Sequence, residues 1–320
     1  MLNTPVLFLV FNRLETTKQV FAKIQEAKPI QLFIAADGAR IDKIGEQEKV
    51  EEVRKFIIDN IDWDCEVKTL FRKNNLGCGK AVSEGITWFF EHVEQGIILE
   101  DDCLPEKSFF FFCQEMLEKY KMEQQIASVC GTNHLFTKYK NKNSYYFSNL
   151  GTIWGWATWR RVWNKYNFNI TEIDIKFFEA KLKLKIPNQK LKKWIITMLT
   201  EVQNKNIDTW DIQWLYTLLI NDTLSIISCK NLVKNIGYVG THTENTVKHH
   251  PFFNMQFFKF DLDKIEHPNQ IKVNSKMDSI TFKAIVKYSL KKTLTVQIKD
   301  VLKKIIPKFI YLSIKKYKNK

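Results

Sequence analysis

The stretch PVLFLVFNRLETTKQVFAKIQEAKPIQLFIAADG, residues 5–38, determines the class of fold. Its two apolar runs, Val6–Phe11 and Ile30–Ala36, flank a segment of helical period, Glu15–Ala27. A short apolar run bounded by polar residues is typical of a buried strand. A strand, a helix and a second strand in this order indicate a parallel crossover unit.

The same alternation continues through the first 120 residues of the chain. Helical periods and apolar runs follow one another at residues 46–60, 66–71, 81–94, 96–99 and 107–120. Strands that are separated by helices of this length pair in parallel and carry helices on both faces. We therefore predict the α/β class, with a Rossmann-like, mainly parallel central sheet flanked by helices.

The second half of the chain is less regular. Aromatic-rich strands and loops begin near Tyr145. The patterns that follow predict helices at 173–184, 189–204 and 212–220 and short strands at 224–227 and 232–235. We predict one domain over residues 1–245, with halves at about 1–130 and about 131–245, and then a linker and basic tail over residues 246–320.

The formal net charge of +14 is concentrated near the C-terminal end. Residues 271–320 contain 14 lysines and two aspartates, which gives +12, so residues 1–270 carry only +2. Lysines alternate there with apolar positions such as Leu294, Ile298 and Val301, a basic amphipathic pattern that binds anionic membrane surfaces. A soluble helix packed on the body is the alternative. Nucleic-acid binding is not expected, because this tail has no arginine.

Cysteine usage and hydropathy predict where the protein works. Six cysteines occur without a C-x-x-C pair, which favours reduced thiols over a zinc site or a disulfide framework. Polar residues follow the first apolar run at once, which argues against a signal peptide, and no apolar stretch is long enough to span a bilayer. We expect a cytoplasmic location, or a peripheral one on the inner face of the membrane.

Three carboxylates, Glu100, Asp101 and Asp102, follow the apolar run Gly96–Leu99. Their mutual repulsion at the end of a buried strand is costly unless a cation neutralises them. Oxygen ligands of this kind suit Mg²⁺ or Mn²⁺, which bind one or two carboxylates and complete their shell with substrate phosphates and water. A solvated acidic turn is the alternative.

Two other strand ends carry polar groups that can bind a ligand. The segment Asn74–Lys80 (NNLGCGK) opens a helix, where free backbone amides attract phosphate, although it is not a Walker A loop. Asp37, which precedes Gly38, can accept hydrogen bonds from a base or a ribose. The alternatives are a flexible loop for the first segment and a tight turn for the second.

These motifs together carry a family resemblance over residues 4–245. They are PVLFLVFNR (5–13), AADG (35–38), NLGCGK (75–80), EDD (100–102), IWGWATW (153–159), TWDIQW (209–214) and GTHT (240–243). In this order they resemble the GT-A class of glycosyltransferases, specifically the bacterial nucleotide-diphospho-sugar transferases related to family 2. The resemblance implies a GT-A fold whose first half binds a nucleotide-sugar and whose second half binds the acceptor.

The resemblance also implies roles for individual residues. Asp102 corresponds to a direct metal ligand of the D-x-D element, and Asp101 or Glu100 to a contact with ribose or a metal-bound water. His242 corresponds to the additional metal ligand that some GT-A enzymes supply from the C-terminal side. The residues expected around the nucleotide are Asn12, Arg13, Asp37, Arg72, Asn75, Gly79, Lys80, Glu100 and Asp101.

Asp211, at the start of a predicted helix and between two indoles, is the candidate general base for an inverting transfer. The alternative is a helix N-cap, since aspartate is favoured at that position. Asp208 is the second candidate base. Most of the tryptophan side chains in 154–163 are expected in the core, with Trp154 or Trp156 as an apolar wall for an acceptor sugar.

The resemblance thus predicts a transfer of sugar from a nucleotide-sugar, with UDP as the expected nucleotide, to a glycan or lipid-linked acceptor. Mn²⁺ or Mg²⁺ is the expected cofactor, inversion the expected stereochemistry, and cell-surface polysaccharide synthesis the expected setting. A sugar nucleotidylyltransferase is one rival function. A non-enzymatic protein that binds membrane or nucleic acid through its basic tail is another.

Overall fold

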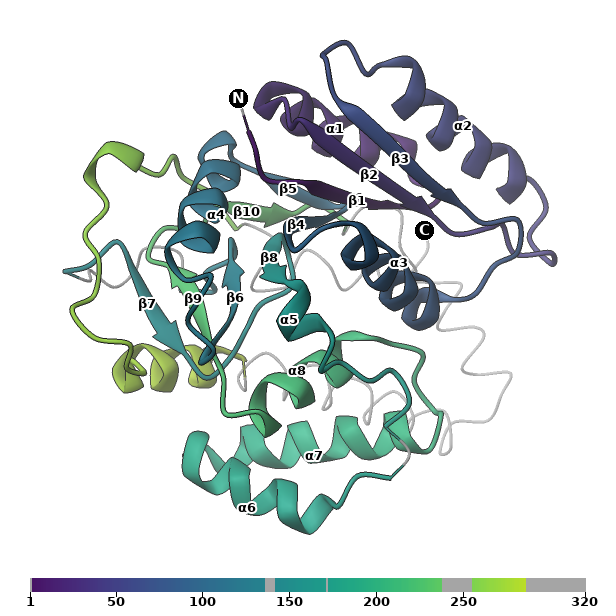
Figure 1. The fold of residues 1–320 in the computed structure, drawn as a ribbon. Helices are drawn as coiled ribbons and strands as arrows, with labels where there is room; N and C mark the ends of the chain where they lie inside the picture. The colour runs from purple at the N-terminus through teal and green to yellow at the C-terminus, as the bar shows by residue number, and fades with distance from the viewer. Residues whose placement is uncertain (1, 136–141, 171, 238–254, 286–320) are drawn as a thin grey trace, which may run out of the picture.

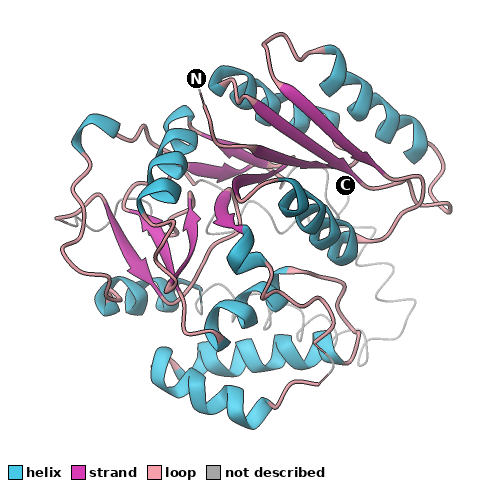
Figure 2. Cartoon of the chain, in the orientation of Figure 1, coloured by secondary structure: helices cyan, strands magenta, loops and turns pink. Residues whose placement is uncertain are grey.

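The computed structural model describes residues 2–135, 142–170, 172–237 and 255–285. One mixed sheet of eight strands forms the centre, and a two-stranded sheet lies beside it (Figures 1 and 2). The strands are β1 (Val6–Val10), β2 (Gln31–Ala36), β3 (Glu66–Phe71), β4 (Gln95–Glu100), β5 (Cys103–Pro105), β6 (Ile126–Cys130), β7 (Tyr145–Ser148), β8 (Trp156–Trp159), β9 (Leu224–Ser228) and β10 (Val233–Asn235). The large sheet has the order β3-β2-β1-β4-β8-β6-β9-β7, and β5 pairs with β10.

Helices connect these strands and cover the sheet. They are α1 (Leu14–Ala27), α2 (Glu46–Asp59), α3 (Cys78–His92), α4 (Lys107–Lys119), α5 (Arg160–Trp163), α6 (Ile175–Lys185), α7 (Gln189–Gln203) and α8 (Asp211–Ile220). Residues 275–285 are also helical. The α/β class predicted from the periodicity is therefore confirmed.

The strands β3, β2, β1 and β4 are mutually parallel, as predicted. The chain moves from β1 outward to β2 and β3 and then returns past β1 to β4. Because such crossovers are right-handed, this reversal places α3 on the opposite face from α1 and α2, and Figure 1 shows α3 on the near face. The reversal also creates a switch point at the carboxyl ends of β1 and β4, where such sheets bind ligands.

The second half extends the same sheet. β8 is antiparallel to both β4 and β6, whereas β9 is parallel to β6 and β7 closes the edge. The helices α6, α7 and α8 pack on one another around a separate apolar cluster that includes Phe178, Leu182 and Leu199. This helical layer lies beyond one end of the sheet in Figure 1.

Residues 255–285 pack against the body, although they fall in the segment predicted as linker and tail. Phe260 joins the main core, and its ring centroid lies 4.8 Å from that of Phe112. The carboxylate of Asp278 accepts a hydrogen bond of 2.6 Å from the Ser148 hydroxyl, which ties the helix at 275–285 to β7. The lysine-rich residues 286–320 lie outside the described residues.

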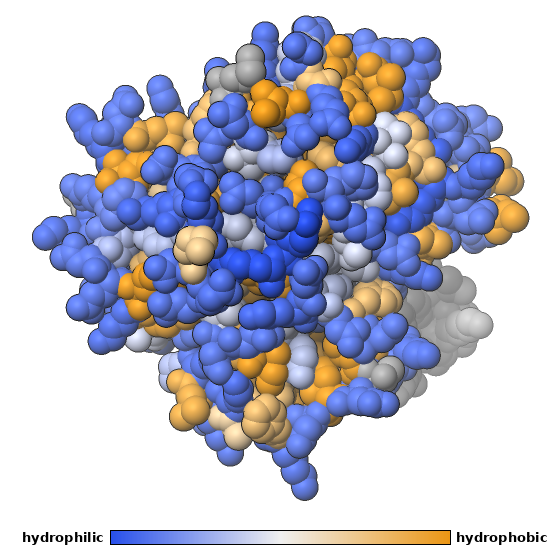
Figure 3. Space-filling view, in the orientation of Figure 1, coloured by the Kyte–Doolittle hydropathy of each residue, from blue (hydrophilic) through white to orange (hydrophobic). Residues whose placement is uncertain are grey.

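The surface of the protein is mainly polar on the face that Figure 3 shows. Polar side chains cover most of the face in Figure 3, and apolar residues appear there in small separate patches. Within the described ranges, the helices are too short or too polar to cross a bilayer.

Candidate active site

Most of the residues predicted around the nucleotide line one pocket of about 680 Å³ at the switch point. The pocket lies at the carboxyl ends of the parallel strands, where the switch-point rule predicts it. From the predicted set it contains Asn12, Arg13, Asp37, Arg72, Asn75, Glu100 and Asp101. Arg40 and Cys78, which no sequence pattern assigned to the nucleotide, also line it, as does Asp208, the second candidate base. We call this space the polar pocket.

Arg13 is the cation that faces the acidic triplet. Its Nε donates to Asp101 Oδ2 at 3.3 Å and its Nη1 to Asp102 Oδ2 at 3.1 Å, while Nη2 forms a close ion pair with Asp101 Oδ1. The sequence pattern alone predicts a divalent metal in this compensating role. Arg13 follows the end of β1, and Asp101 and Asp102 follow the end of β4. The guanidinium and the two carboxylates therefore meet at the carboxyl ends of neighbouring strands.

The one positive charge of Arg13 faces three carboxyl groups, those of Glu100, Asp101 and Asp102. Burial raises the pKa of Asp101 to about 6, although Arg13 acts in the opposite direction. Burial also raises the pKa of Glu100 to about 8, and the charges of Asp102 and Asp101 add to this effect. For Arg13, burial works against the charged form, but the two aspartates outweigh it and raise the pKa.

The triplet offers only part of a metal site. Among the residues that the structure describes, no group of three or more His, Cys, Asp or Glu side chains is placed to hold a metal. Asp102 Oδ2 lies against Gly237, where an added Cβ would come within 2.1 Å of it. His242, the predicted additional ligand, lies outside the described residues. The oxygen-only set still fits Mg²⁺ or Mn²⁺ that takes most of its ligands from phosphates and water.

Asp37 organises the loop that follows β3. Its carboxylate accepts hydrogen bonds from the backbone amides of Gly38 and Leu76 at 3.0 Å and of Gly77 at 3.2 Å. Asn75 Nδ2 donates to the Gly38 carbonyl oxygen at 2.7 Å, which closes the same loop from the other side. Burial raises the pKa of Asp37 against these amides. The residue predicted to bind the base is thus already engaged with the backbone.

Arg54 supports the pocket from behind and was not predicted. It lies on α2, and its Nη2 donates to the carbonyl oxygens of Asp37 at 3.1 Å and of Arg72 at 2.6 Å, so it joins the ends of β2 and β3. A sequence signal exists, because Arg54 stands on the buried face of α2 next to Val53 and Ile57. A basic residue in an apolar stripe needs buried acceptors.

A second unpredicted group lies at the edge of the polar pocket. Glu46, at the start of α2, accepts from Asn12 Nδ2 at 2.9 Å and from the Arg40 amide at 2.8 Å, and it forms a close ion pair with the Arg40 guanidinium. Hydrogen bonding to Arg40 lowers the pKa of Glu46 to about 2. These contacts fix Asn12 and Arg40 beside the pocket.

The start of α3 differs from the prediction of free phosphate-binding amides. The Gly79 amide donates to Asp208 Oδ1 at 3.0 Å, so a carboxylate from the second half already occupies this helix N-terminus. Gly77 has a φ of 83°, and an added Cβ there would come within 2.6 Å of Asp208 Oδ2. Lys80 lies on the exposed side of the turn, and its Nζ is 3.6 Å from Glu84 Oε1.

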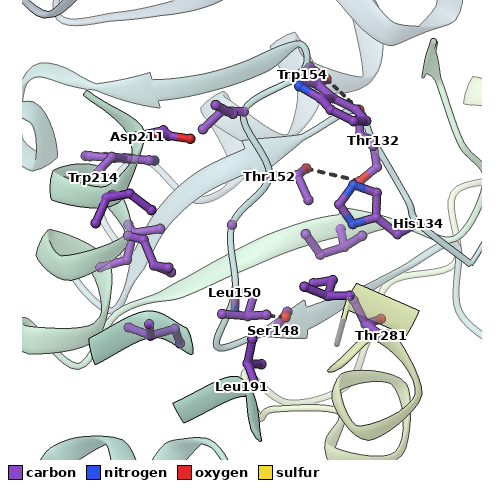
Figure 4. Close-up of a pocket in the computed structure, with 18 of the residues that line it drawn as sticks. Thr132, His134, Ser148, Leu150, Thr152, Trp154, Leu191, Asp211, Trp214 and Thr281 are labelled. Carbon is purple, nitrogen blue, oxygen red and sulfur yellow. Dashed lines mark hydrogen bonds between the residues drawn. The ribbon is translucent and has the colours of Figure 1, made fainter. Parts of the chain in front are cut away.

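Asp211 lies at a second pocket of about 330 Å³ (Figure 4). It is the first residue of α8, and the N-cap is Trp210 without a side-chain cap, so the N-cap alternative is not what the structure shows. Its carboxylate accepts a close hydrogen bond from the Thr209 hydroxyl. Burial is the main cause of the raised pKa of Glu100, and the charge of Asp211 is a further, smaller contribution in the same direction.

The tryptophans near Asp211 are mostly core, as predicted. Trp156, Trp163 and Trp214 are almost fully buried, and the rings of Trp156 and Trp210 stack at 5.9 Å. Trp154 is only partly buried and lines the second pocket. Of Trp154 and Trp156, the two residues predicted as an apolar wall, only Trp154 lines this pocket.

Comparison with known proteins finds solved structures that resemble this chain at low sequence identity. No family model matches the chain, and no curated protein matches it. Residues 1–349 of TarS from S. aureus share 8% identity at a TM-score of 0.41, over 77% of this chain and 62% of that one. UDP-glucose pyrophosphorylase complexed with UDP-glucose shares 12% at 0.39, over 77% and 98%. HddC from Yersinia pseudotuberculosis shares 10% at 0.31, over 51% and 80%. Similarity at this level does not distinguish one reaction from another.

Proposed function

We propose that this protein is a glycosyltransferase that moves a sugar from a nucleotide-sugar, with UDP as the expected nucleotide, to an acceptor hydroxyl. The observation that carries the proposal is the placement of two aspartates. Asp208 lines the polar pocket and Asp211 lines the second pocket, three positions further along the chain. This spacing supports Asp211 as the base that acts between a donor in one space and an acceptor in the other.

The polar pocket has the size and lining for the donor. Its volume of about 680 Å³ lies within the usual range of about 300–1,000 Å³ for ligand sites. Arg13, Arg40 and Arg72 supply guanidinium groups, which suit the two phosphates of a nucleoside diphosphate. Asn75 and the loop held by Asp37 lie at the ends of β2 and β3, and we assign the base and ribose to that side.

A divalent cation fits this proposal as a partner of the donor. Asp102, with Glu100 or Asp101 beside it and His242 as an additional ligand, is the proposed protein part of its shell. When bound, Mn²⁺ or Mg²⁺ would stabilise the negative charge that develops on the departing diphosphate. Arg13 already supplies one positive charge at this place, whatever the state of the metal site.

The proposed reaction is a single displacement. The acceptor oxygen forms a bond to the anomeric carbon, the bond from that carbon to the phosphate oxygen breaks, and its electron pair leaves with the nucleoside diphosphate. The hydroxyl proton passes to the carboxylate of Asp211. Attack from the face opposite the leaving group inverts the anomeric configuration.

The test is a panel of nucleotide-sugars in a thermal-shift assay with and without Mn²⁺, because a ligand that binds the native state raises its melting temperature. Release of UDP in the presence of acceptors then measures turnover. Asp211→Asn should lower turnover by about 10²- to 10⁴-fold with little change in donor affinity, and Asp62→Asn, the same change at an exposed aspartate between α2 and β3, serves as a control.

Transfer at the parent rate by Asp211→Asn would remove Asp211 from the mechanism and leave Asp208 as the residue to test. A sugar nucleotidylyltransferase would instead release pyrophosphate from UTP and a sugar 1-phosphate, without any need for an acceptor. That result would overturn the proposal.

A further inference from the structure

The second pocket, beside Asp211, has an apolar lining. It lies between α7, α8, the loop before β8 and the helix at 275–285 (Figure 4). Its apolar wall includes Leu150, Trp154, Leu191, Ile195, Leu215 and Leu218. These side chains come from segments up to about seventy positions apart, so the apolar surface is a product of the tertiary fold. We call this space the apolar pocket.

Three hydroxyl groups around the apolar pocket are engaged with the protein itself, whereas the indole Nε1 of Trp214 is a buried donor in the lining without a hydrogen-bond partner among the described residues. The Ser148 hydroxyl donates to Asp278 at 2.6 Å, and the Thr152 hydroxyl donates to the Thr132 carbonyl oxygen at 3.1 Å. The Thr132 hydroxyl donates to the Trp154 carbonyl oxygen at 2.6 Å. Among the described residues of the lining, the carboxylate is that of Asp211, at one end of the pocket in Figure 4.

This lining distinguishes between two kinds of acceptor. A sugar in the pocket would bury several hydroxyl groups against a mainly apolar wall, in which Asp211 and Trp214 Nε1 could pair only some of them, and each unpaired hydroxyl would weaken binding by about 5- to 150-fold. An apolar chain needs no such partners and gains from leaving water. The pocket of about 330 Å³ equals the space of about eleven water molecules at about 30 Å³ each, which is enough for a short stretch of chain.

We propose that the apolar pocket binds the hydrocarbon chain of a lipid-linked acceptor and holds the acceptor hydroxyl at Asp211. This inference rests on the proposed glycosyl transfer, because Asp211 is the base in that reaction. It selects a lipid-linked acceptor over a free glycan. The reaction is unchanged: the hydroxyl at the head of the lipid loses its proton to Asp211 as its oxygen bonds to the anomeric carbon.

The experiment measures the binding of n-alkyl β-D-glucosides with butyl, hexyl and octyl chains to the full chain by calorimetry, below their micelle concentrations. Each buried methylene should tighten Kd by about fourfold, since it contributes about 0.8 kcal/mol. Geranyl β-D-glucoside is compared with the decyl compound, which has the same ten carbon atoms in its chain, and the tighter of the two assigns an isoprenoid or a straight chain. A maltose-to-maltotetraose series should bind without a gain per added sugar.

Matched variants locate the binding. Leu215→Trp fills the pocket from α8 and should abolish the chain-length dependence, whereas Ile220→Trp, on the same helix but outside the lining, should retain it. Trp194→Ala removes part of the pocket wall on α7 and serves in case the first variant folds poorly. It should reduce the gain in affinity per methylene, whereas its control Met198→Ala, on the same helix but outside the lining, should retain it. A thermal shift with UDP reports the polar pocket in every variant.

Two results would overturn the inference. One is a Kd that does not change with chain length in the parent protein, and the other is equal chain-length dependence in Leu215→Trp and Trp194→Ala and in their controls. An affinity that rises with each added glucose would assign a glycan to the pocket instead. If UDP fails to bind while the chain-length dependence is present, the donor assignment fails and the apolar pocket stands.

Discussion

Replacement of Arg13 by methionine tests how the acidic triplet is compensated. Methionine keeps much of the length of the side chain but removes the guanidinium that pairs with Asp101 and Asp102. The Asp101 side chain is 4% exposed and that of Asp102 16%, so the variant leaves one buried and one mostly buried carboxylate without their partner. Loss of one partner from a buried ion pair costs about 3–5 kcal/mol.

The lower end of that range applies here. The Arg13 side chain is 34% exposed, so solvent already screens part of the interaction. We expect a loss of about 3 kcal/mol in the free energy of unfolding. At about 2–4 °C per kcal/mol, the melting temperature should fall by about 6–12 °C. Asp101→Asn in the same background should regain part of the loss, because it removes one uncompensated carboxylate.

Urea denaturation of the parent, both single variants and the double variant measures this coupling directly. Lys80→Met is the control, since Lys80 is an exposed cation 3.6 Å from Glu84 and its loss should cost less than about 0.5 kcal/mol. If Arg13→Met unfolds at the same urea midpoint as the parent, or if Asp101→Asn gives no recovery, the guanidinium does not compensate the triplet.

Three further predictions concern the metal, the loop and the tail. Mn²⁺ should increase the thermal shift given by UDP, and Asp102→Asn should lose this increase; a normal metal response in the variant would remove Asp102 from the site. Asp37→Ala should weaken nucleotide binding more than it slows turnover, because it frees the amides of Leu76 and Gly77; a large fall in turnover at unchanged donor affinity would contradict this. Deletion of residues 286–320, with 11 lysines and one aspartate, should leave UDP binding intact but release the protein from anionic vesicles in sedimentation. Salt should have the same effect on the full chain, as the Debye length falls from about 10 Å at 0.1 M to about 3 Å at 1 M; a full chain that ignores anionic vesicles at low salt would refute membrane binding.

The charge pattern does not show where the folded body ends and the basic tail begins. A cut at residue 275 follows from the lysine count alone, but Met277 and Phe282 are buried and Asp278 bonds to Ser148. Such a cut would remove part of the core. Lysine spacing reports charge along the chain, whereas burial depends on what the helix at 275–285 meets in the folded body.

The sequence by itself determined the parallel half of the sheet and much of the polar pocket. Apolar runs and helical periods are local, and parallel strands bring their carboxyl ends to one edge. Asn12, Asp37 and Glu100 could therefore be placed together without knowledge of any contact. The order of β8, β6 and β9 was not accessible in this way, because their pairing depends on partners far along the chain.

Only the tertiary structure decided how the site is held and charged. Arg13 meets Asp101 across 88 positions and Gly79 meets Asp208 across 129, and neither pair leaves a pattern in the chain. The apolar pocket likewise joins side chains from α7, α8 and the loop before β8. Periodicity reports which face of an element is buried, but the partner of a buried charge, or the shape of a buried space, is set by where separate elements come together in the fold.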